Sequence, residues 1–336
     1  MKKKNIWKGR HGPLLIAEIG GNHEGNFRYA KKLTEKAIAS GADVIKFQMY
    51  KGDTLVNRNI SPDRNNHFKK FELTKKQHLE LAQICMSNGV QYNASVWDIE
   101  MLKWIDKYLS FYKIGSGDLT AFPIISEFAK RGKPILLSTG LSKIDEIKQT
   151  IRFIKKINPV YKKKHMLAIM QCTSMYPTKD ADVNLSVIKE FKKKFKIDVG
   201  YSDHSIGDLA LLIAYSEGAN ILEFHFTDSR KNKTFRDHFV SLTKHEVKEL
   251  CLKIVRTKVL LGSSKKKVLK SEIDSGNLKS FRRALYFNKN IKKGEIIKKK
   301  NLVCLRPNEG LDARKINFIV GKKSPSDFKA YKKIKL

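Results

Sequence analysis

Two histidines stand at the ends of neighbouring predicted strands, where their spacing suits a metal site. His204 ends one predicted strand and His225 lies on the next, 21 residues later. This separation is about one strand-to-strand repeat of a barrel and could bring both imidazoles toward one point, where they can hold a divalent ion. Glu18 and Asp237 could complete the ligand set or act through bound water.

Two lysines lie inside predicted strands, where a charged side chain is costly to bury. Lys46 and Lys113 each need an anion or a carboxylate to offset their desolvation, so a buried salt bridge explains either lysine taken singly. Taken together with the polar residues at most other strand ends, they favour an anion-binding site. Those polar residues are Asn22, His23, Gln48, Ser95, Ser116, Ser138, Thr139, Ser174, Tyr176 and Asp203.

Two short segments rich in glycine and serine each follow a strand and precede a helix. In Gly115-Ser116-Gly117-Asp118 and in Ser138-Thr139-Gly140, small residues allow backbone N–H groups and hydroxyls to approach a phosphate. Tight turns between strands and helices use the same residues, so each segment alone is weak evidence. Their occurrence on neighbouring strands, beside Lys113, indicates a phosphorylated substrate.

The other histidines and the cysteines are expected to be structural. We expect ordinary core or surface side chains at His11, His67, His78, His165 and His245. The cysteines stand far apart, in hydrophobic runs and without metal-site spacing, which favours reduced, buried thiols. They are Cys85, Cys172, Cys251 and Cys304.

Eight short segments rich in strand-forming residues alternate with segments of helical periodicity. Strands are predicted at 14–19, 44–48, 91–96, 112–114, 135–138, 166–171, 198–201 and 221–226. Helices between them are predicted at 27–40, 75–87, 144–155, 185–195 and 209–216. This alternation predicts an α/β fold, a (β/α)8 TIM barrel of parallel strands whose chemistry lies at the carboxyl ends of the strands.

The pattern changes after a long predicted helix at 244–261. We expect residues 1–262 to form the barrel domain, residues 263–279 a polar linker, and residues 280–336 a small β-rich domain. Strands are predicted in this small domain at 284–287, 294–297 and 303–306.

The composition is that of a globular protein with a large excess of basic residues. Lys and Arg number 68 against 33 Asp and Glu, which gives a formal net charge of +35. Such a charge attracts anions of every kind. Because no basic arm, zinc-knuckle spacing or aromatic-basic motif accompanies it, we expect a solvated surface and no nucleic-acid partner. The basic start at 1–10 lacks a signal-type apolar stretch and no run approaches ~20 apolar residues, so we expect a cytoplasmic protein without membrane contact.

Seven ordered motifs resemble those of the sialic acid synthase family, whose members make nonulosonic acids from phosphoenolpyruvate and N-acetylated hexosamines. The resemblance runs from about Leu14 to the C-terminus. The motifs are AEIGGNHEG at 17–25, IKFQ at 45–48, YKIGSGD at 112–118, LSTG at 137–140, CTSMYPT at 172–178, GYSDHS at 200–205 and EFHFT at 223–227. The resemblance implies a transferase of the N-acetylneuraminate synthase type.

The resemblance also implies a role for each matching residue. The carboxylate and phosphate of phosphoenolpyruvate would be held, with Gln48 nearby, by Lys46, Ser95, Lys113, Ser116, Gly117, Ser138, Ser174 and Tyr176. His204 and His225 would hold Mn2+ or Mg2+, which polarises the sugar aldehyde toward the enol carbon. Glu18 would handle the protons of the aldehyde or of a metal-bound water.

The C-terminal residues 280–336 resemble the antifreeze-like (SAF) domain that this family fuses to its barrel. Arg306 stands where family members carry an arginine that contacts the substrate. In the family this domain reaches into the active site of the partner subunit. The resemblance therefore implies a domain-exchanged homodimer in which Arg306 completes the other chain's pocket.

Two segments that face the sugar depart from the family pattern. Family members usually carry Gly-Pro-Asp where this chain reads TFRDH at 234–238, so Asp237 matches the acid one residue late, and Arg236 and His238 alter that wall. The usual Arg-Pro-Gly-x-Gly reads RPNEG at 306–310. The acceptor stays open between N-acetylmannosamine, a diacetamido-hexose leading to legionaminic or pseudaminic acid, and rarer sugars.

Two other functions compete with this reading. A phosphoenolpyruvate aldolase of the Kdo-8-phosphate or heptulosonate type shares the barrel and the first substrate, but the antifreeze-like tail argues against it. A non-catalytic barrel that binds anions or nucleic acid is supported by the net charge of +35 alone. Such a protein would show steeply salt-dependent binding without turnover.

Overall fold

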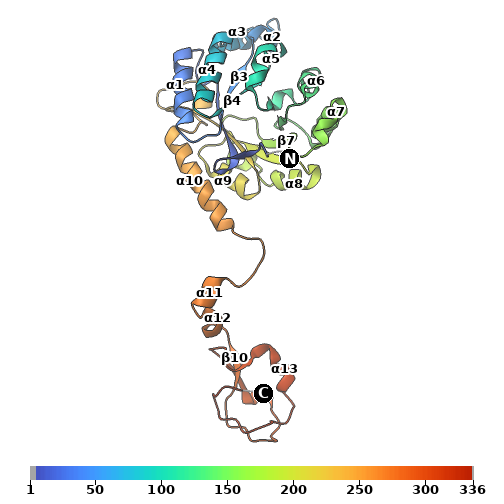
Figure 1. The fold of residues 1–336 in the computed structure, drawn as a ribbon, viewed down its shortest axis with the longest axis vertical. Helices are drawn as coiled ribbons and strands as arrows, with labels where there is room; N and C mark the ends of the chain where they lie inside the picture. Colours follow the sequence, from blue (N-terminus) through green and yellow to red (C-terminus); the bar gives the residue numbers. More distant parts are fainter. Residues whose placement is uncertain (1–4, 335–336) are drawn as a thin grey trace. The chain divides into compact units, whose positions relative to one another are not determined.

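A computed structural model describes residues 5–334. The chain folds into two compact units. The first unit runs to Gly262 and the second begins at Ser263 (Figure 1). Each unit has its own hydrophobic core.

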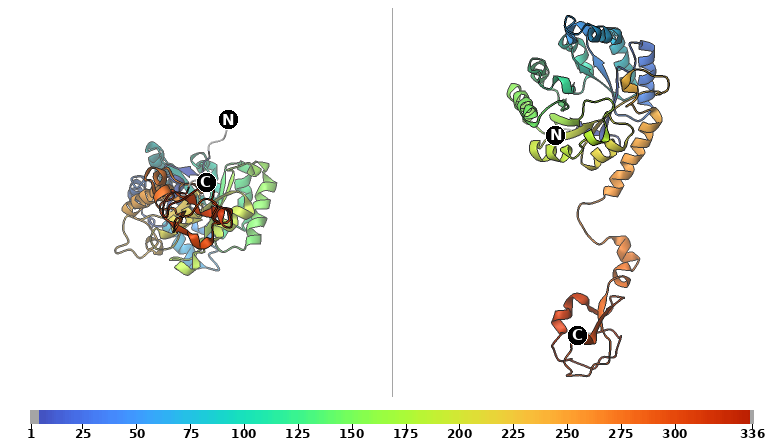
Figure 2. Two further views of the ribbon diagram at one scale, coloured as in Figure 1. Left: turned by 90° about the horizontal axis from the view of Figure 1, so that it is seen from below. Right: turned by 180° about the vertical axis from the view of Figure 1, so that it is seen from behind.

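Eight parallel strands form a barrel in the first unit, and helices surround it (Figures 1 and 2). The strands are β2 (Gly12–Gly20), β3 (Val44–Met49), β4 (Gln91–Val96), β5 (Tyr112–Ile114), β6 (Ile135–Ser138), β7 (Leu167–Cys172), β8 (Asp198–Ser202) and β9 (Ile221–His225). They pair in the order β4-β3-β2-β9-β8-β7-β6-β5, and β4 contacts β5 to bring the two ends together. Each strand lies within two residues of its predicted bounds, so the predicted fold is confirmed.

The helices of the first unit follow the strands in alternation. They are α1 (Phe27–Ile38), α2 (Gly52–Leu55), α3 (Pro62–Phe71), α4 (Lys75–Ser87), α5 (Leu102–Ile105), α6 (Phe122–Arg131), α7 (Ile144–Ile157), α8 (Val187–Phe195), α9 (Leu209–Ser216) and α10 (Lys244–Leu261). Thr74 and Thr243 cap the amino-terminal ends of α4 and α10. Each side chain accepts a hydrogen bond from the backbone N–H three residues later. The predicted elements do not include the insertion with α2 and α3, or helices α5 and α6.

The barrel interior changes from apolar to polar along the strands, because side chains two residues apart share a face. The apolar part consists of Trp7, Leu14, Ile16, Val44, Phe111, Leu136, Ala168, Met170 and Ile221. Trp7 precedes β1 (Lys8–Gly9), which pairs with β2, and its indole N–H donates to the His165 carbonyl at 3.1 Å. Farther along the same strand faces come Glu18, Lys46 and Glu223, so the polar end is the carboxyl end.

The second unit contains a small antiparallel sheet of strand order β11-β10-β12. Its elements are α11 (Lys270–Asp274), α12 (Asn277–Ser280), β10 (Ala284–Phe287), β11 (Leu302–Leu305), β12 (Leu311–Asp312) and α13 (Ile316–Ile319). The strand predicted at 294–297 is wrong, since that segment makes only an isolated bridge between Ile296 and Lys323. Residues 263–279, predicted as a linker, contain helix α11 and most of helix α12.

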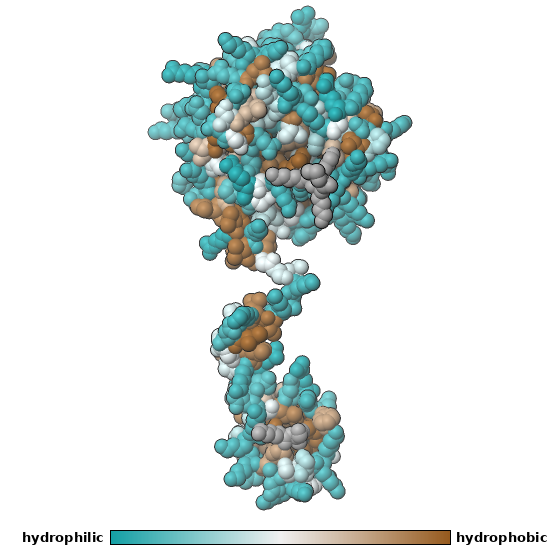
Figure 3. Space-filling model, in the orientation of Figure 1, coloured by the Kyte–Doolittle hydropathy of each residue, from teal (hydrophilic) through white to brown (hydrophobic). Residues whose placement is uncertain are grey.

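Most of the surface visible in Figure 3 is hydrophilic, in keeping with the excess of lysine. The lysine runs at 192–194, 265–267 and 298–300 are all exposed. Exposed apolar side chains gather on α10 and in the segment after it; they are Leu252, Val255, Val259, Leu260, Leu261, Val268, Leu269 and Ile273. None of the helices within residues 5–334 has the length and apolar character needed to cross a membrane.

All four cysteines are free thiols, as predicted. Burial is as expected at three of them, but Cys304 is only half-buried. Cys304 lies on β11 of the small sheet, where no residue is fully buried, and packs at the edge of the small core of the second unit.

Candidate active site

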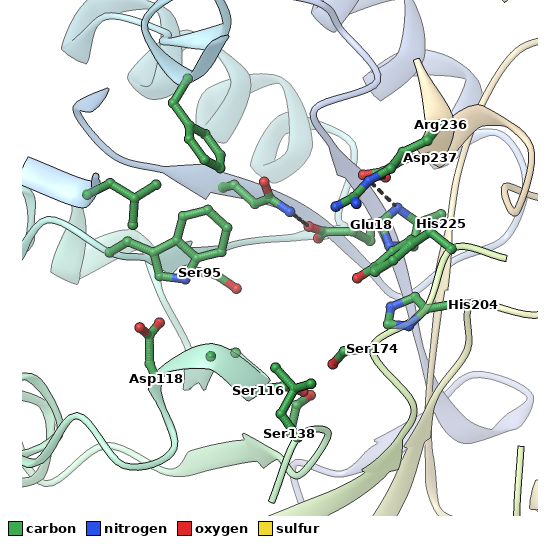
Figure 4. Close-up of a pocket in the computed structure, with 18 of the residues that line it drawn as sticks. Glu18, Ser95, Ser116, Asp118, Ser138, Ser174, His204, His225, Arg236 and Asp237 are labelled. Carbon is green, nitrogen blue, oxygen red and sulfur yellow. Dashed lines mark hydrogen bonds and ion pairs between the residues drawn. The ribbon is translucent and has the colours of Figure 1, made fainter. Parts of the chain in front are cut away.

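The carboxyl ends of the barrel strands surround a cavity of about 1060 Å³ (Figure 4). All predicted site residues of the first unit line it: Glu18, Lys46, Gln48, Ser95, Lys113, Ser116, Gly117, Ser138, Ser174, Tyr176, His204, His225 and Asp237. Arg306 belongs to the second unit, where it is exposed directly after β11 with its guanidinium 5.6 Å from the Phe281 ring centre.

Two acids and two bases form a buried cluster on the floor of this cavity. Lys46 Nζ lies 2.5 Å from Glu18 Oε2 and 3.8 Å from Glu223 Oε1, and Lys113 Nζ lies 2.8 Å from the same Glu223 oxygen. Burial opposes the charge of Lys46, but the two carboxylates outweigh it and its pKa is raised. The salt-bridge explanation therefore holds for both lysines, and any bound anion would share these cations with the carboxylates.

Three further hydrogen bonds connect the charged groups of the cluster to neighbouring polar side chains. They run from Gln48 to Glu18 (3.1 Å), from Lys46 to Ser95 (3.3 Å) and from Ser202 to Glu223 (3.3 Å). Burial raises the pKa of Glu223, but Lys113 and Lys46 lower it further, so the net pKa lies below its usual value and the carboxylate is ionised. The cluster is thus a fixed arrangement of charges rather than a set of mobile side chains.

Three serine hydroxyls and a glycine form a concave surface at the ends of β5, β6 and β7. The Gly140 N–H donates to Ser116 Oγ at 3.1 Å. A Cβ atom at position 140 would overlap Ser174 Oγ and lie 2.8 Å from Ser116 Oγ, so the surface requires glycine there. Ser138 Oγ is buried and has no hydrogen-bond partner among residues 5–334. Clustered hydroxyls of this kind suit the oxygens of a phosphate.

The rings of His204 and His225 lie side by side, with their centres 5.3 Å apart. His204 Nδ1 lies 2.8 Å from the Thr173 carbonyl, so it donates a hydrogen bond and leaves Nε2 with a free lone pair. Burial, with a contribution from His225, lowers the pKa of His204 to about 3. The ring is therefore neutral at neutral pH, as a metal ligand must be.

This pair of imidazoles fits part of a divalent metal site. His225 Nδ1 is buried without a hydrogen-bond partner among the described residues and lies 3.7 Å from Asp237 Oδ2. Within residues 5–334 no three His, Cys, Asp or Glu side chains are grouped so that they could hold a metal. A metal here would take two protein nitrogens and leave the other positions to substrate and water.

The loop after β9 contributes Arg236 and Asp237 to the cavity, but not His238. The side chain of His238 is fully buried, with Nδ1 2.7 Å from Thr227 Oγ1 and Nε2 3.1 Å from Glu24 Oε1. The expectation that His238 alters the cavity wall is therefore wrong. It anchors the loop, because one imidazole can bridge two partners that lie behind the wall.

Four other polar residues at strand ends do not line the cavity and instead form hydrogen bonds with neighbouring groups. Asn22 donates to the Phe226 carbonyl and Ser241, His23 accepts from the Gly25 N–H, Thr139 donates to the Met170 carbonyl, and Asp203 accepts from Tyr201 and Ser205. The prediction that these residues belong to the anion site is therefore wrong, since they stabilise the segments that follow the strands.

The cavity also contains residues that the sequence motifs do not indicate. Glu223 lies two residues before His225 on β9, and the alternation of side chains along a strand would have placed both inside the barrel. Arg64 and His67 come from α3, and Trp97 follows β4. His67 was expected to be ordinary, but it lines the wall. No motif marks the α2–α3 insertion, so only the fold reveals it.

Comparison with known proteins identifies the family. The NeuB family model matches residues 33–266, and the SAF domain model matches residues 282–330. The N,N'-diacetyllegionaminic acid synthase of Campylobacter jejuni is 34% identical over 329 residues, which cover 94% of this chain and 97% of that protein. Human N-acetylneuraminate-9-phosphate synthase is 33% identical over 280 residues, covering 79% and 76%.

A solved structure agrees with this match. The N-acetylneuraminic acid (sialic acid) synthetase of Leptospira borgpetersenii has a TM-score of 0.73 and 29% identity, covering 82% of this chain and 96% of that one. With a family model across most of the barrel and relatives aligned along nearly the whole chain, the protein belongs to the NeuB family and ends in a SAF domain.

Proposed function

We propose that the protein condenses phosphoenolpyruvate with the aldehyde of an N-acetylated hexosamine, N-acetylmannosamine or a related sugar, to give a nonulosonic acid and phosphate. One observation carries this proposal: a single cavity joins a cluster of two lysines and three serine hydroxyls to a pair of buried imidazoles. The named relatives, which are synthases of such acids, support it.

Phosphoenolpyruvate would occupy the lysine and serine side of the cavity. Lys46 and Lys113 supply positive charge for its carboxylate and phosphate, while the hydroxyls of Ser116, Ser138 and Ser174 supply donors for the phosphate oxygens. Because hydrogen bonds already fix the lysines, these groups can stabilise the charge that develops as phosphate leaves without first reorganising.

The sugar aldehyde would lie on the histidine side. C3 of phosphoenolpyruvate forms a carbon–carbon bond with the aldehyde carbon, and the aldehyde oxygen takes up a proton. Water then adds at C2, and the tetrahedral carbon releases phosphate by C–O cleavage. Glu18, held by Lys46 and Gln48, is positioned to move the proton of the aldehyde oxygen or of the attacking water.

A divalent ion, Mn2+ or Mg2+, belongs to the proposal, with His204 and His225 as its protein ligands. When bound, the ion would polarise the aldehyde carbonyl. Its support is the neutral, lone-pair-bearing His204 ring and the unpartnered Nδ1 of His225 among the described residues.

A homodimer is also part of the proposal, with Arg306 of one chain completing the cavity of the other. Arg306 is exposed and makes no ion pair among the residues that the structure describes. Helix α10 exposes Leu252, Val255 and Val259, three and four residues apart on one side, as helices that pack against a partner do.

Phosphate release tests the proposed function. The protein is incubated with phosphoenolpyruvate, Mn2+ and a panel of hexosamines, and release is expected with at least one N-acetylated sugar. Release only with arabinose 5-phosphate or erythrose 4-phosphate would favour the Kdo-8-phosphate or heptulosonate-type aldolase. Steeply salt-dependent binding to DNA or RNA, with no turnover on any sugar, would favour the non-catalytic barrel.

A further inference from the structure

Arg236 presents an oriented guanidinium at the exposed edge of the cavity. Its Nε lies 3.3 Å from Asp237 Oδ1, and its guanidinium carbon lies 4.6 Å from the centre of the Tyr176 ring. The side chain is 69% exposed, and its two terminal nitrogens have no hydrogen-bond partner among residues 5–334. Two contacts therefore fix the plane of the group while its two-pronged donor end stays free.

The same guanidinium ends a stack that begins at the buried histidines. The centre of the Tyr176 ring lies 4.0 Å from the centre of the His204 ring and 4.6 Å from the guanidinium carbon of Arg236. His204 is 6% exposed, so the stack runs from the floor of the cavity to its mouth. Figure 4 shows Arg236 and Asp237 on the same side of the cavity as His204 and His225. A sugar with its aldehyde at the histidines would extend its far end toward Arg236.

A second arginine lines the cavity from α3. Arg64 is exposed and makes no ion pair or hydrogen bond with any residue that the structure describes. Helix α3 contacts the loop that carries Arg236, because the Phe235 ring lies 6.0 Å from His67 and 5.0 Å from Phe71. The two arginines thus stand on elements that pack against each other.

The charge balance of the cavity separates these arginines from the phosphoenolpyruvate side. Lys46 and Lys113 already share Glu18 and Glu223 on the floor. Arg64 adds a cation without an acidic partner among the described residues, and Arg236 keeps both terminal nitrogens free. Guanidinium groups with free paired donors bind phosphate oxygens two at a time.

We propose that the acceptor sugar carries a phosphate group at the end distant from its aldehyde, and that Arg236, with Arg64 as a second cation, binds this phosphate. The inference rests on the proposed function, because it names the acceptor of that reaction. In this view the residues at the mouth of the cavity determine which sugar is used, while the floor binds the substrate common to all acceptors.

Initial rates with N-acetylmannosamine and with its 6-phosphate, at saturating phosphoenolpyruvate and Mn2+, test the proposal. The unmodified protein is expected to show kcat/KM at least tenfold higher for the phosphorylated sugar. Arg236→Gln should lower kcat/KM for the phosphorylated sugar roughly ten- to a hundredfold. It should change kcat/KM for the unphosphorylated sugar by less than about threefold. Arg236→Lys should retain part of the preference, because it keeps the charge but loses the planar fork.

Arg58→Gln is the matched control, since Arg58 lies in the same insertion as Arg64 but does not line the cavity. It removes one positive charge and should leave both rates unchanged. Equal rates for the two sugars in the unmodified protein, or an equal loss for both sugars in Arg236→Gln, would overturn the inference. So would a loss of phosphoenolpyruvate affinity in that variant.

Binding of unreactive analogues separates this inference from the proposed function. Calorimetry compares N-acetylmannosaminitol 6-phosphate with N-acetylmannosaminitol, neither of which has an aldehyde to react. The unmodified protein should bind the phosphorylated alditol at least tenfold more tightly, and Arg236→Gln should lose that difference. If no sugar supports phosphate release, the proposed function fails, and the alditol pair still decides whether Arg236 binds a phosphate.

Discussion

At the scale of single residues, the site depends on charged groups that neutralise one another while buried. Glu223 is the centre of this arrangement, because it contacts both lysines and accepts from Ser202. Its carboxylate and a substrate anion would be alternative partners for the same cations. A residue that holds lysines in place therefore also competes with the substrate for them.

Replacing Glu223 tests this competition. Glu223→Gln should lower the free energy of unfolding by about 3 kcal/mol, because it leaves Lys113 buried without its carboxylate. Phosphoenolpyruvate should then raise the melting temperature of the variant more than that of the unmodified protein, since the ligand replaces the missing charge. Thermal melts with and without phosphoenolpyruvate measure this, and an equal or smaller shift in the variant would contradict it.

The histidine pair predicts metal dependence. Thorough chelation should abolish turnover, and Mn2+ or Mg2+ should restore it. His204→Ala should be inactive but should melt within a few degrees of the unmodified protein, because the apolar core does not include this side chain. Full turnover after metal removal would count against a metal role for the pair.

Asp118 predicts a pH-dependent stability. Burial raises its pKa to about 6, above the value of about 3.9 for an unfolded chain, so the folded protein binds this proton more tightly. Stability from the group is present below about pH 4 and is lost as the pH rises through 6. Relative to Asp118→Asn, the free energy of unfolding of the unmodified protein should fall by about 1–2 kcal/mol between pH 4 and pH 7. This range allows for the partial exposure of the Asp118 side chain.

Urea unfolding of both proteins at pH 4, 5, 6 and 7 measures this difference. Two curves that stay parallel across the range would show that the Asp118 carboxyl is as well solvated in the folded protein as in the unfolded chain.

At the scale of elements, the site depends on how closely the turns after β5, β6 and β7 approach one another. Gly140 shows this most directly, since a methyl group there would meet the hydroxyls of Ser116 and Ser174. Gly140→Ala should weaken phosphoenolpyruvate binding roughly tenfold or more, because the added methyl group would push the Ser116 and Ser174 hydroxyls apart. The same crowding should lower the free energy of unfolding by about 1–3 kcal/mol.

Gly117→Ala is the control for stability, because a methyl group there would meet no atom within 4 Å. Its melting temperature should be unchanged. Calorimetry with phosphoenolpyruvate measures affinity in the Gly140 variant, and normal affinity together with normal stability would show that the turns are less crowded than the structure indicates.

The sequence predicts these elements unevenly, for physical reasons. The eight strands were predictable because each is a buried run bounded by turn residues, and alternation within them would also have found Glu223. The insertion with α3 was not, because Arg64 and His67 reach the cavity only through tertiary packing on Phe235 and Phe71. The segment 294–297 contains two consecutive isoleucines, which favour a strand, yet in so small a unit it makes one bridge and no ladder.

At the scale of the whole molecule, the two units raise the question of which cavity Arg306 serves. In the proposed homodimer, a mixture of Arg306→Ala and Glu18→Ala chains should recover part of the activity that each variant alone has lost. A heterodimer would contain one cavity with both residues intact. Turnover of the mixture, measured after heterodimers have been isolated by two affinity tags, decides this; heterodimers that stay inactive would show that Arg306 serves its own chain or none.

The distribution of charge in the molecule has a kinetic consequence. The chain as a whole carries +35, yet the formal charges that line the cavity are balanced; they are Lys46, Arg64, Lys113 and Arg236 against Glu18, Asp118, Glu223 and Asp237. The field of the outer surface attracts an anion from a distance and is screened over about 8–10 Å at physiological ionic strength. Added salt should therefore lower the association rate constant of phosphoenolpyruvate by a larger factor than it raises the dissociation rate constant.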